Sequence, residues 1–219
     1  MSKAIYAGMT RPDYSIPDGK YPARLVQIIQ IGSQLFGKNS DKPWRSPQIL
    51  LGFEFPTLTY ENRDGEEVSN IKSQTFFLSM NPSRNQIGLR EVVDGLRGSS
   101  EYTEEELEKF DISSFLGKEC MVTLTGVESK GQVYQNITAV EQFTTGEGES
   151  GILKQFRTPI LVTLDDFNNL DNLDLPEWIK SKIMDSEEFQ AQFEKAPVNE
   201  PYKKPEEEEK EIKIEDVPF

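Results

Sequence analysis

The 219-residue chain contains no histidine and a single cysteine. Without histidine the sequence lacks the usual general base near neutral pH, the Ser-His-Asp and Cys-His nucleophilic arrangements, and histidine-ligated metal sites. One cysteine excludes an intramolecular disulfide and a cysteine-rich zinc site, and the alternating apolar run around Cys120 predicts that this thiol is a small buried core residue. We therefore expect a non-enzymatic protein with no catalytic residues, no metal and no other cofactor.

Long hydrophobic runs are also missing. No segment approaches the roughly 20 consecutive apolar residues that a bilayer-spanning helix needs. The first residues, Met1–Tyr6, contain no apolar stretch followed by a small-residue cleavage site, so they do not predict a secretory signal. We expect a soluble, cytoplasmic protein that has no membrane partner.

Negative charge is abundant but unevenly distributed. The formal net charge is -14, made up of +2 over residues 1–98, -6 over residues 99–160 and -10 over residues 161–219. A strongly acidic surface repels the phosphates of nucleic acid within about a Debye length. That argument does not apply to the N-terminal half, because it is close to neutral and has enough cations for a local basic groove.

The N-terminal half contains three segments with the period-two pattern of β-strands. A long loop, about residues 32–46, separates the first two, and the Asp64-Gly65 hairpin signature separates the second from the third. Leu51, Phe53 and Phe55 share one face, and Pro56 is expected to stop that strand. The predicted strands are Arg24–Ile31, Ile49–Phe55 and about Val68–Ser79.

A helix is predicted next, because apolar residues recur at helical spacing from Ile87 to Leu96 and Gly98 supplies a stop. A capping box at Thr103 predicts a second short helix, and two further strands follow at 120–125 and 133–140. Three strands, a helix and two strands is the order of the five-stranded OB-fold barrel, with its helix between strands three and four. The sequence thus predicts a mainly β protein with an OB-fold domain over residues 21–145, after an irregular lead-in at residues 1–20.

The C-terminal part has a different composition. Residues 146–196 begin with an acidic, glycine-rich spacer and then predict an extra strand at 158–164 and helices at about 165–170 and 176–195. Residues 197–219 combine prolines with a run of four glutamates and contain no core-like segment. This composition predicts a disordered acidic tail.

Cations and aromatic rings alternate in the long first loop. Proteins hold single-stranded nucleic acid with cations that follow the phosphates and rings that stack on bases. Trp44 is the leading candidate, with packing over the barrel mouth as its structural alternative. One row of the third strand extends this surface, although alternation does not decide which row faces the groove, and Phe53, Phe55 and Phe77 are assigned to the core. The nucleic-acid-binding candidates are Phe36, Lys38, Lys42, Trp44, Arg45, Tyr60, Arg63, Lys72, Gln74, Phe76, Lys130 and Tyr134.

The last residues of the sequence form a second candidate site, for a protein partner. They are Glu215, Asp216, Val217, Pro218 and Phe219. This segment resembles the tail of bacterial single-stranded DNA-binding proteins, in which an acidic run precedes Asp-Ile-Pro-Phe, with Val217 in place of Ile. A terminal Phe offers a ring and a carboxylate that a pocket with a basic lip can recognise.

Four runs in the body of the chain carry a broader resemblance, over roughly residues 20–145. They are Tyr21–Leu25, Gly52–Pro56, Phe77–Pro82 and Phe110–Lys118. They are similar to phage-encoded proteins of replication regions that are regarded as OB-fold single-stranded DNA-binding proteins. The resemblance implies a protein of the host cytoplasm that coats and protects single-stranded DNA during replication, recombination or repair, with little sequence specificity. Its acidic tail would recruit replication or recombination proteins, and homo-oligomerisation is left open.

Two other functions fit parts of the sequence. The charge of -10 over residues 161–219 suits an acidic protein-interaction module or a DNA mimic that inhibits a host protein. A small virion or assembly component is the other alternative. The mixture of rings and cations at residues 36–45 favours the DNA-binding interpretation over both.

Overall fold

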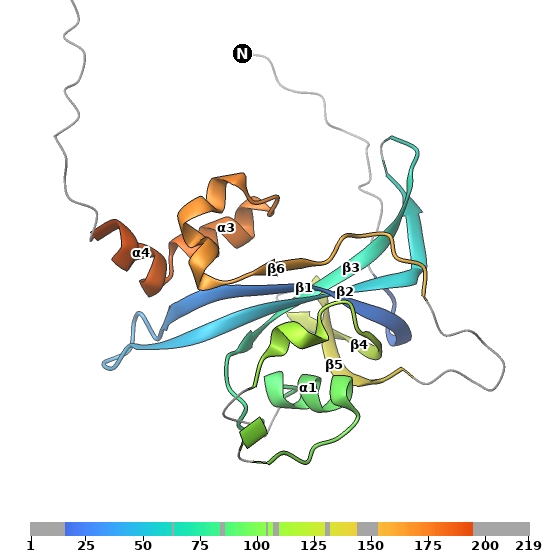
Figure 1. Cartoon of the computed structure of the whole chain (residues 1–219), viewed down its shortest axis with the longest axis horizontal. Coiled ribbons are helices and arrows are strands. Elements are labelled where there is room, and N and C mark those ends of the chain that lie inside the picture. Colours follow the sequence, from blue (N-terminus) through green and yellow to red (C-terminus); the bar gives the residue numbers. More distant parts are fainter. Residues whose placement is uncertain are drawn as a thin grey trace, which may run out of the picture.

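The structure is a computed structural model, and it describes residues 16–62, 64–83, 86–103, 105–106, 110–129, 132–143 and 153–194. Most of the predicted lead-in, the glycine-rich spacer and the predicted tail lie outside the described residues. The protein is mainly β, with one twisted sheet and helices on both of its faces (Figure 1). The predicted fold class is thus confirmed as a mainly β protein with a few helices.

The predicted order of three strands, a helix and two strands is confirmed. Five antiparallel strands occur in the spatial order β3-β2-β1-β4-β5, and a sixth short strand runs parallel to β1. Within the described residues no backbone ladder joins β3 to β5, so the sheet is open. The strands are β1 Gly19–Phe36, β2 Trp44–Glu61, β3 Glu67–Phe77, β4 Glu119–Ser129, β5 Gln132–Gln142 and β6 Ile160–Val162.

β1 is the central strand and is much longer than predicted. It keeps β2 along one edge, while its other edge pairs with β4 at residues 19–24 and with β6 at residues 27–29. The register with β2 shifts between Leu25 and Gln27 and again between Gln30 and Gly32. Shifts of this kind bend a strand and increase its twist, so β1 can leave β4 and meet β6.

Two predicted strand ends are wrong. The loop expected at 32–46 is only residues 37–43, because Phe36 and Trp44 still pair as the last position of the β1–β2 ladder. Pro56 does not stop β2, which continues to Glu61. The β2–β3 register is irregular between Phe55 and Thr59, and a residue without an N–H is tolerated there because no ladder bond is lost.

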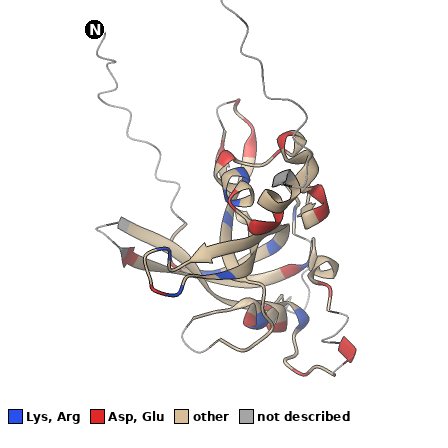
Figure 2. Ribbon diagram, turned by 90° about the vertical axis from the view of Figure 1, so that its left-hand side faces the viewer, with Lys and Arg blue, Asp and Glu red and all other residues tan. Residues whose placement is uncertain are grey.

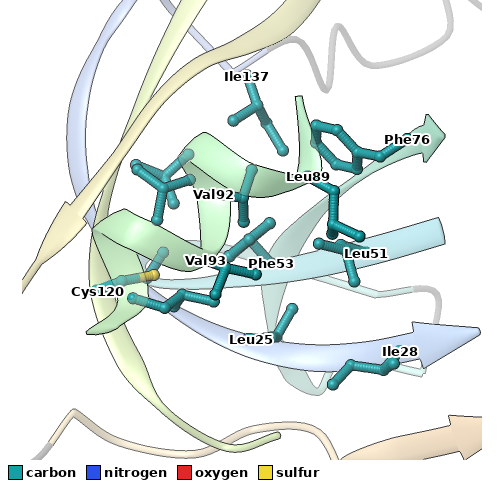
Figure 3. Packing of buried hydrophobic residues seen from close by; sticks show 14 of the residues in the cluster. Leu25, Ile28, Leu51, Phe53, Phe76, Leu89, Val92, Val93, Cys120 and Ile137 are labelled. Carbon is teal, nitrogen blue, oxygen red and sulfur yellow. The ribbon is translucent and has the colours of Figure 1, made fainter. Parts of the chain in front are cut away.

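The helix α1, Leu89–Arg97, ends as predicted at Gly98, whose φ of 77° lies in the left-handed region that glycine favours. α1 packs on what we call the inner face of the sheet, against a core that includes Leu25, Phe53 and Cys120 (Figure 3). Cys120 is fully buried, as predicted. Contact with β5 is close at Gly95, where a Cβ would lie 1.9 Å from the carbonyl oxygen of Val140.

The segment between α1 and β4 contains the capping box predicted at Thr103. The Thr103 N–H donates to Glu106 Oε2 at 2.8 Å, and the Glu106 N–H donates to the Thr103 hydroxyl at 3.2 Å. A short 3₁₀ helix, η1 Ile112–Phe115, begins after Asp111, whose carboxylate accepts from the Ser113 N–H. These local bonds engage two carboxylates of this segment, Glu106 and Asp111.

The C-terminal segment covers the opposite, outer face of the sheet. It contains β6 and the helices η2 Leu164–Asn172, α3 Glu177–Met184 and α4 Glu187–Glu194 (Figure 1). The helix predicted at 176–195 is therefore two helices that meet around Ser186, and the one predicted at 165–170 is a 3₁₀ helix. A second buried core forms between this segment and the sheet, from Ile29, Ile31, Leu50, Val162, Phe167, Leu170, Leu175, Ile179 and Ile183.

Charged side chains fasten the start of this segment to the sheet. The Arg24 guanidinium, almost fully buried, donates to Glu119 Oε1 at 2.8 Å and to the Leu153 carbonyl at 2.5 Å. The Leu153 N–H donates in turn to the same Glu119 oxygen. Glu54, also buried, accepts from the Ser69 hydroxyl at 2.7 Å. The chain at Leu153 is thus tied to two strands, β1 and β4, before it enters β6.

No helix in the described part of the chain is long and apolar enough to cross a membrane. The same residues contain no group of three or more acidic or cysteine side chains arranged to hold a metal ion.

Candidate nucleic-acid interface

Three aromatic rings meet at the end of the β1–β2 hairpin, and we call Phe36, Trp44 and Phe77 the aromatic cluster. The Phe36 and Trp44 rings stack with centroids 4.6 Å apart and an interplanar angle of 21°. Phe77 completes the group, with its centroid 5.3 Å from Phe36 and 5.8 Å from Trp44. The rings thus come from the ends of three adjacent strands.

Strand register explains why the three rings share a face. Phe36 lies directly opposite Trp44, and Phe77 lies opposite Gln48, which is four residues along β2 from Trp44. Residues an even number apart on a strand point to the same side, here the outer face. Trp44 is 50% exposed and Phe77 is 40% exposed. Large rings in contact with each other and with solvent are a recognised mark of a binding surface.

Cations surround this cluster. Lys38 and Lys42 are exposed in the loop that joins β1 to β2. Arg45 is partly engaged within the protein, because its Nη1 donates to the Ser33 carbonyl at 3.2 Å and its Nε lies 3.6 Å from Glu187 Oε2. Figure 2, which looks toward this end of the molecule, shows basic residues in the hairpin loop together with acidic Asp41, and acidic residues on the C-terminal helices. The loop therefore offers positive charge beside the rings.

α4 holds the base of this hairpin in place. The Glu188 carboxylate accepts from the Ser33 N–H at 2.6 Å and from the Ser33 hydroxyl at 2.7 Å. Burial opposes the charged form of Glu188, but these hydrogen bonds and the nearby Arg45 outweigh it and lower the pKa of the carboxyl. The carboxylate is ionised at neutral pH and links α4 to β1 close to the aromatic cluster.

On the third strand, the row of residues that was selected from the sequence does not lie on the outer face. Lys72, Gln74 and Phe76 lie opposite core residues of β2, so they belong to the inner face. Phe76 is 4% exposed and points into the inner core (Figure 3). Phe77, assigned to the core from the sequence, is the exposed ring, and that assignment is wrong. Alternation alone cannot decide which of two neighbouring phenylalanines in a strand points into the core. The pairing of β3 with β2 decides it.

Gln74 performs a structural task. Its side-chain oxygen accepts from the Ile137 N–H at 2.8 Å, and its side-chain nitrogen donates to the Ile137 carbonyl at 3.4 Å. These bonds bridge β3 and β5 where no backbone ladder joins them. The amide of Gln74 is therefore engaged inside the protein and is not presented to a ligand.

A cavity of about 520 Å³ lies between β3 and α3, and we call it the β3–α3 cavity. Arg157 and Asp174 line it, together with Ile71 and Ser73 of β3. Lys72 adjoins it from the same strand, but its side chain belongs to the inner face. Burial lowers the pKa of Lys72, and within the described residues its ammonium has no ion-pair partner. Arg157 donates from Nη2 to the Ser69 carbonyl at 3.0 Å, while its buried Nε has no hydrogen-bond partner among the described residues. The Arg157 guanidinium therefore has one donor beside this cavity that no described residue uses.

The remaining candidates lie away from the aromatic cluster. Tyr60 is half-buried near the opposite end of β2, close to the β2–β3 turn (Figure 1). Tyr134 is exposed on β5, where it pairs with Val127 of β4. Both tyrosines make contacts of their own within the protein. Arg63, Lys130 and the terminal segment Glu215–Phe219 lie outside the described residues.

Sequence reasoning missed three residues of this surface. Phe77 was assigned to the core, and Arg157 and Trp178 were not selected as candidates. Trp178 is in fact 50% exposed, while Ile179 and Ile183 form the buried stripe of α3. Helical geometry could have separated them, because successive residues point about 100° apart around a helix.

No protein-family model matches the chain, and no curated protein matches it either. The function is therefore argued from the geometry of the surface itself.

Proposed function

We propose that this protein binds single-stranded DNA along the outer face of β2 and β3, largely without sequence specificity. The observation that carries the proposal is the aromatic cluster, with Trp44 and Phe77 exposed and with Lys38 and Lys42 in the adjoining loop. Base–aromatic stacking contributes about 1–3 kcal/mol per base and tolerates any sequence. The lysines would follow the phosphates on either side of the stacked bases.

Strand connectivity supports an OB-fold assignment. β1 pairs with both β2 and β4, and α1 lies between β3 and β4 in the chain, as in that fold. The OB-fold is a partly open barrel whose second and third strands and first loop bind oligonucleotides. In this protein the Gln74 side chain would stand in for backbone pairing at the seam of the barrel. The aromatic cluster then falls at the position where OB-folds bind their ligand.

The proposed mode of binding favours single strands over duplexes. The bases of a duplex are already stacked and paired, so their faces are not available to Trp44 or Phe77. Acidic residues lie on the C-terminal helices, and basic residues lie in the hairpin loop (Figure 2). Negative charge beside the loop would confine a bound phosphate backbone to a narrow path. A narrow path of this kind suits one flexible strand better than a rigid double helix.

The biological role follows from the resemblance noted in the sequence. Such a protein would coat and protect single-stranded DNA during phage replication or recombination. Its terminal segment, Glu215–Phe219, would recruit replication proteins through the Phe219 ring and carboxylate. The DNA-binding surface and the recruiting segment would then be separate parts of the chain.

Fluorescence anisotropy tests the proposal. A labelled oligo-dT strand and a matched duplex are titrated with the wild-type protein and with the Phe36→Ala/Trp44→Ala double variant. Met184→Ala, which removes an exposed apolar side chain from α3, is the control. We expect the wild type and the control to prefer the single strand, and the double variant to bind at least about tenfold more weakly, because two stacking rings are lost.

If the wild type ignores both DNAs at low salt, the proposal is wrong. The acidic protein-interaction module, or DNA mimic, would then become the working hypothesis, since the acid on the C-terminal helices would be the remaining feature that suggests a partner.

A further inference from the structure

The β3–α3 cavity and the aromatic cluster lie on the same strand. The outer row of β3 runs from Ile71 and Ser73, which line the cavity, through Thr75 to Phe77 in the cluster. Six residues of a strand span about 20 Å at a rise of 3.3 Å per residue. An extended ligand bound at the cluster could therefore follow β3 directly to the cavity.

The cavity offers an anion a guanidinium with a donor that no described residue uses. Arg157 and Asp174 are the charged side chains of its outer-face lining, because the side chain of Lys72 belongs to the inner face. No ion pair joins Arg157 to Asp174, and the buried Arg157 Nε still lacks an acceptor within the described part of the chain. A buried donor without an acceptor costs free energy that a ligand oxygen would recover. Phosphate oxygens meet that need, and guanidinium and ammonium groups both bind them.

An aromatic ring borders the same cavity. Trp178 lies in the first turn of α3 and is 50% exposed. The Lys182 ammonium is 5.9 Å from the centre of its ring. A ring open to solvent beside cations repeats the combination found at the aromatic cluster, and it is the combination that single-stranded nucleic acid requires.

We propose that the β3–α3 cavity is a second contact for the same DNA strand, with Arg157 on its phosphates and Trp178 stacked on a base. The inference rests on the proposed function and adds to it the course of the strand, from the aromatic cluster along β3 to α3. The C-terminal segment then forms one wall of the DNA path. A strand with a rise of 3.4 Å per nucleotide needs about six nucleotides to span the two contacts.

The chain provides its own probes, because its two tryptophans lie one at each contact. In the full-length Trp44→Phe variant, Trp178 is the sole tryptophan, and a ring remains in the aromatic cluster. Unlabelled dT15 is added while Trp178 emission is recorded, and labelled dT15 reports binding by anisotropy in parallel. We expect quenching of Trp178 emission over the same concentration range as the anisotropy change.

The outcomes separate the two proposals. An anisotropy change with unaltered Trp178 emission would overturn the second contact and leave single-strand binding in place. No anisotropy change with the wild-type protein would refute the proposed function itself.

Substitutions give an independent measure. Because Trp178 is exposed, Trp178→Ala should fold normally, and we expect it to bind dT15 about fivefold or more weakly than the wild type. Arg157→Gln, checked for folding by its thermal melt, should reduce the slope of log K against log salt by about 0.7, the value for one phosphate contact on a single strand. Met184→Ala, on the same helix, should match the wild type in both measurements. Wild-type affinity in Trp178→Ala would contradict the inference.

Discussion

The side-chain amide of Gln74 pairs with both backbone groups of Ile137, across a gap that no backbone ladder spans in the described residues. One side chain thus supplies, between β3 and β5, the two bonds that a neighbouring strand would otherwise supply. The inner core lies directly beneath this bridge, with Ile137 itself among its members. The geometry explains how the sheet can remain open at this edge and still cover its core.

Gln74→Ala would therefore act on stability. Removing the amide leaves the Ile137 N–H without its acceptor, at a cost of about 1–3 kcal/mol in the free energy of unfolding. Urea denaturation of the variant and the wild type measures this difference. Unchanged stability combined with weakened single-strand binding would instead mean that Gln74 serves the ligand.

Cys120 makes the free energy of unfolding depend on pH in the alkaline range. Burial, followed by the charge of Glu119, raises the pKa of its thiol to about 12, whereas an unfolded chain has a value near 8.5. Above about pH 8.5 the unfolded thiol loses its proton while the folded one retains it, so the unfolded state is favoured increasingly up to pH 12.

We expect the wild type to lose about 1.4 kcal/mol per pH unit in this window relative to Cys120→Ala. Urea denaturation at pH 8, 9 and 10 gives the two slopes, and the comparison cancels titrations that both proteins share. Parallel curves would show that the thiol is not buried as described.

Gly95 sets the distance between α1 and β5. A Cβ at this position would lie 1.9 Å from the Val140 carbonyl oxygen, which is backbone and cannot rotate away. Gly95→Ala is expected to lower the free energy of unfolding by about 3 kcal/mol or more.

Gly117→Ala is the matched comparison for that substitution. Gly117 has a φ of 84°, and nothing lies within 4 Å of its Cβ position, so only backbone strain of about 1 kcal/mol is added. Equal losses in the two variants, measured by urea denaturation, would contradict the close packing of α1 on β5.

Lys38 and Lys42 should carry the salt dependence of DNA binding at the hairpin. Each phosphate contact on a single strand contributes about 0.7 to the slope of log K against log salt. The Lys38→Ala/Lys42→Ala variant is therefore expected to lower that slope by about 1.4 while keeping its preference for single strands. Anisotropy titrations at four salt concentrations provide the slopes, and an unchanged slope would remove these lysines from the interface.

Much of the fold was predictable because the signals are local. Period-two segments identified five strands, and helical spacing followed by Gly98 placed α1 and its end. The mixture of rings and lysines also drew attention to Phe36 and Trp44, whose rings stack in the structure, although both lie at strand ends and not in the loop. Each of these features depends on residues close together in the sequence.

What the sequence could not supply depends on pairing between distant segments. The choice between Phe76 and Phe77 follows from the register of β3 on β2, which no local pattern encodes. Likewise, Arg157 and Trp178 join β3 only because β6 pairs with β1 and places the C-terminal segment over the outer face. Long-range topology therefore decided the part of the candidate site that was missed.

Trp44 emission gives the most direct test of the central claim, that exposed rings at the hairpin stack on DNA bases. In the Trp178→Phe variant, Trp44 is the only tryptophan. Titration with unlabelled dT15 should quench its emission in step with the anisotropy of labelled dT15, and a matched duplex should have little effect. Binding by anisotropy with unaltered Trp44 emission would contradict stacking at the aromatic cluster.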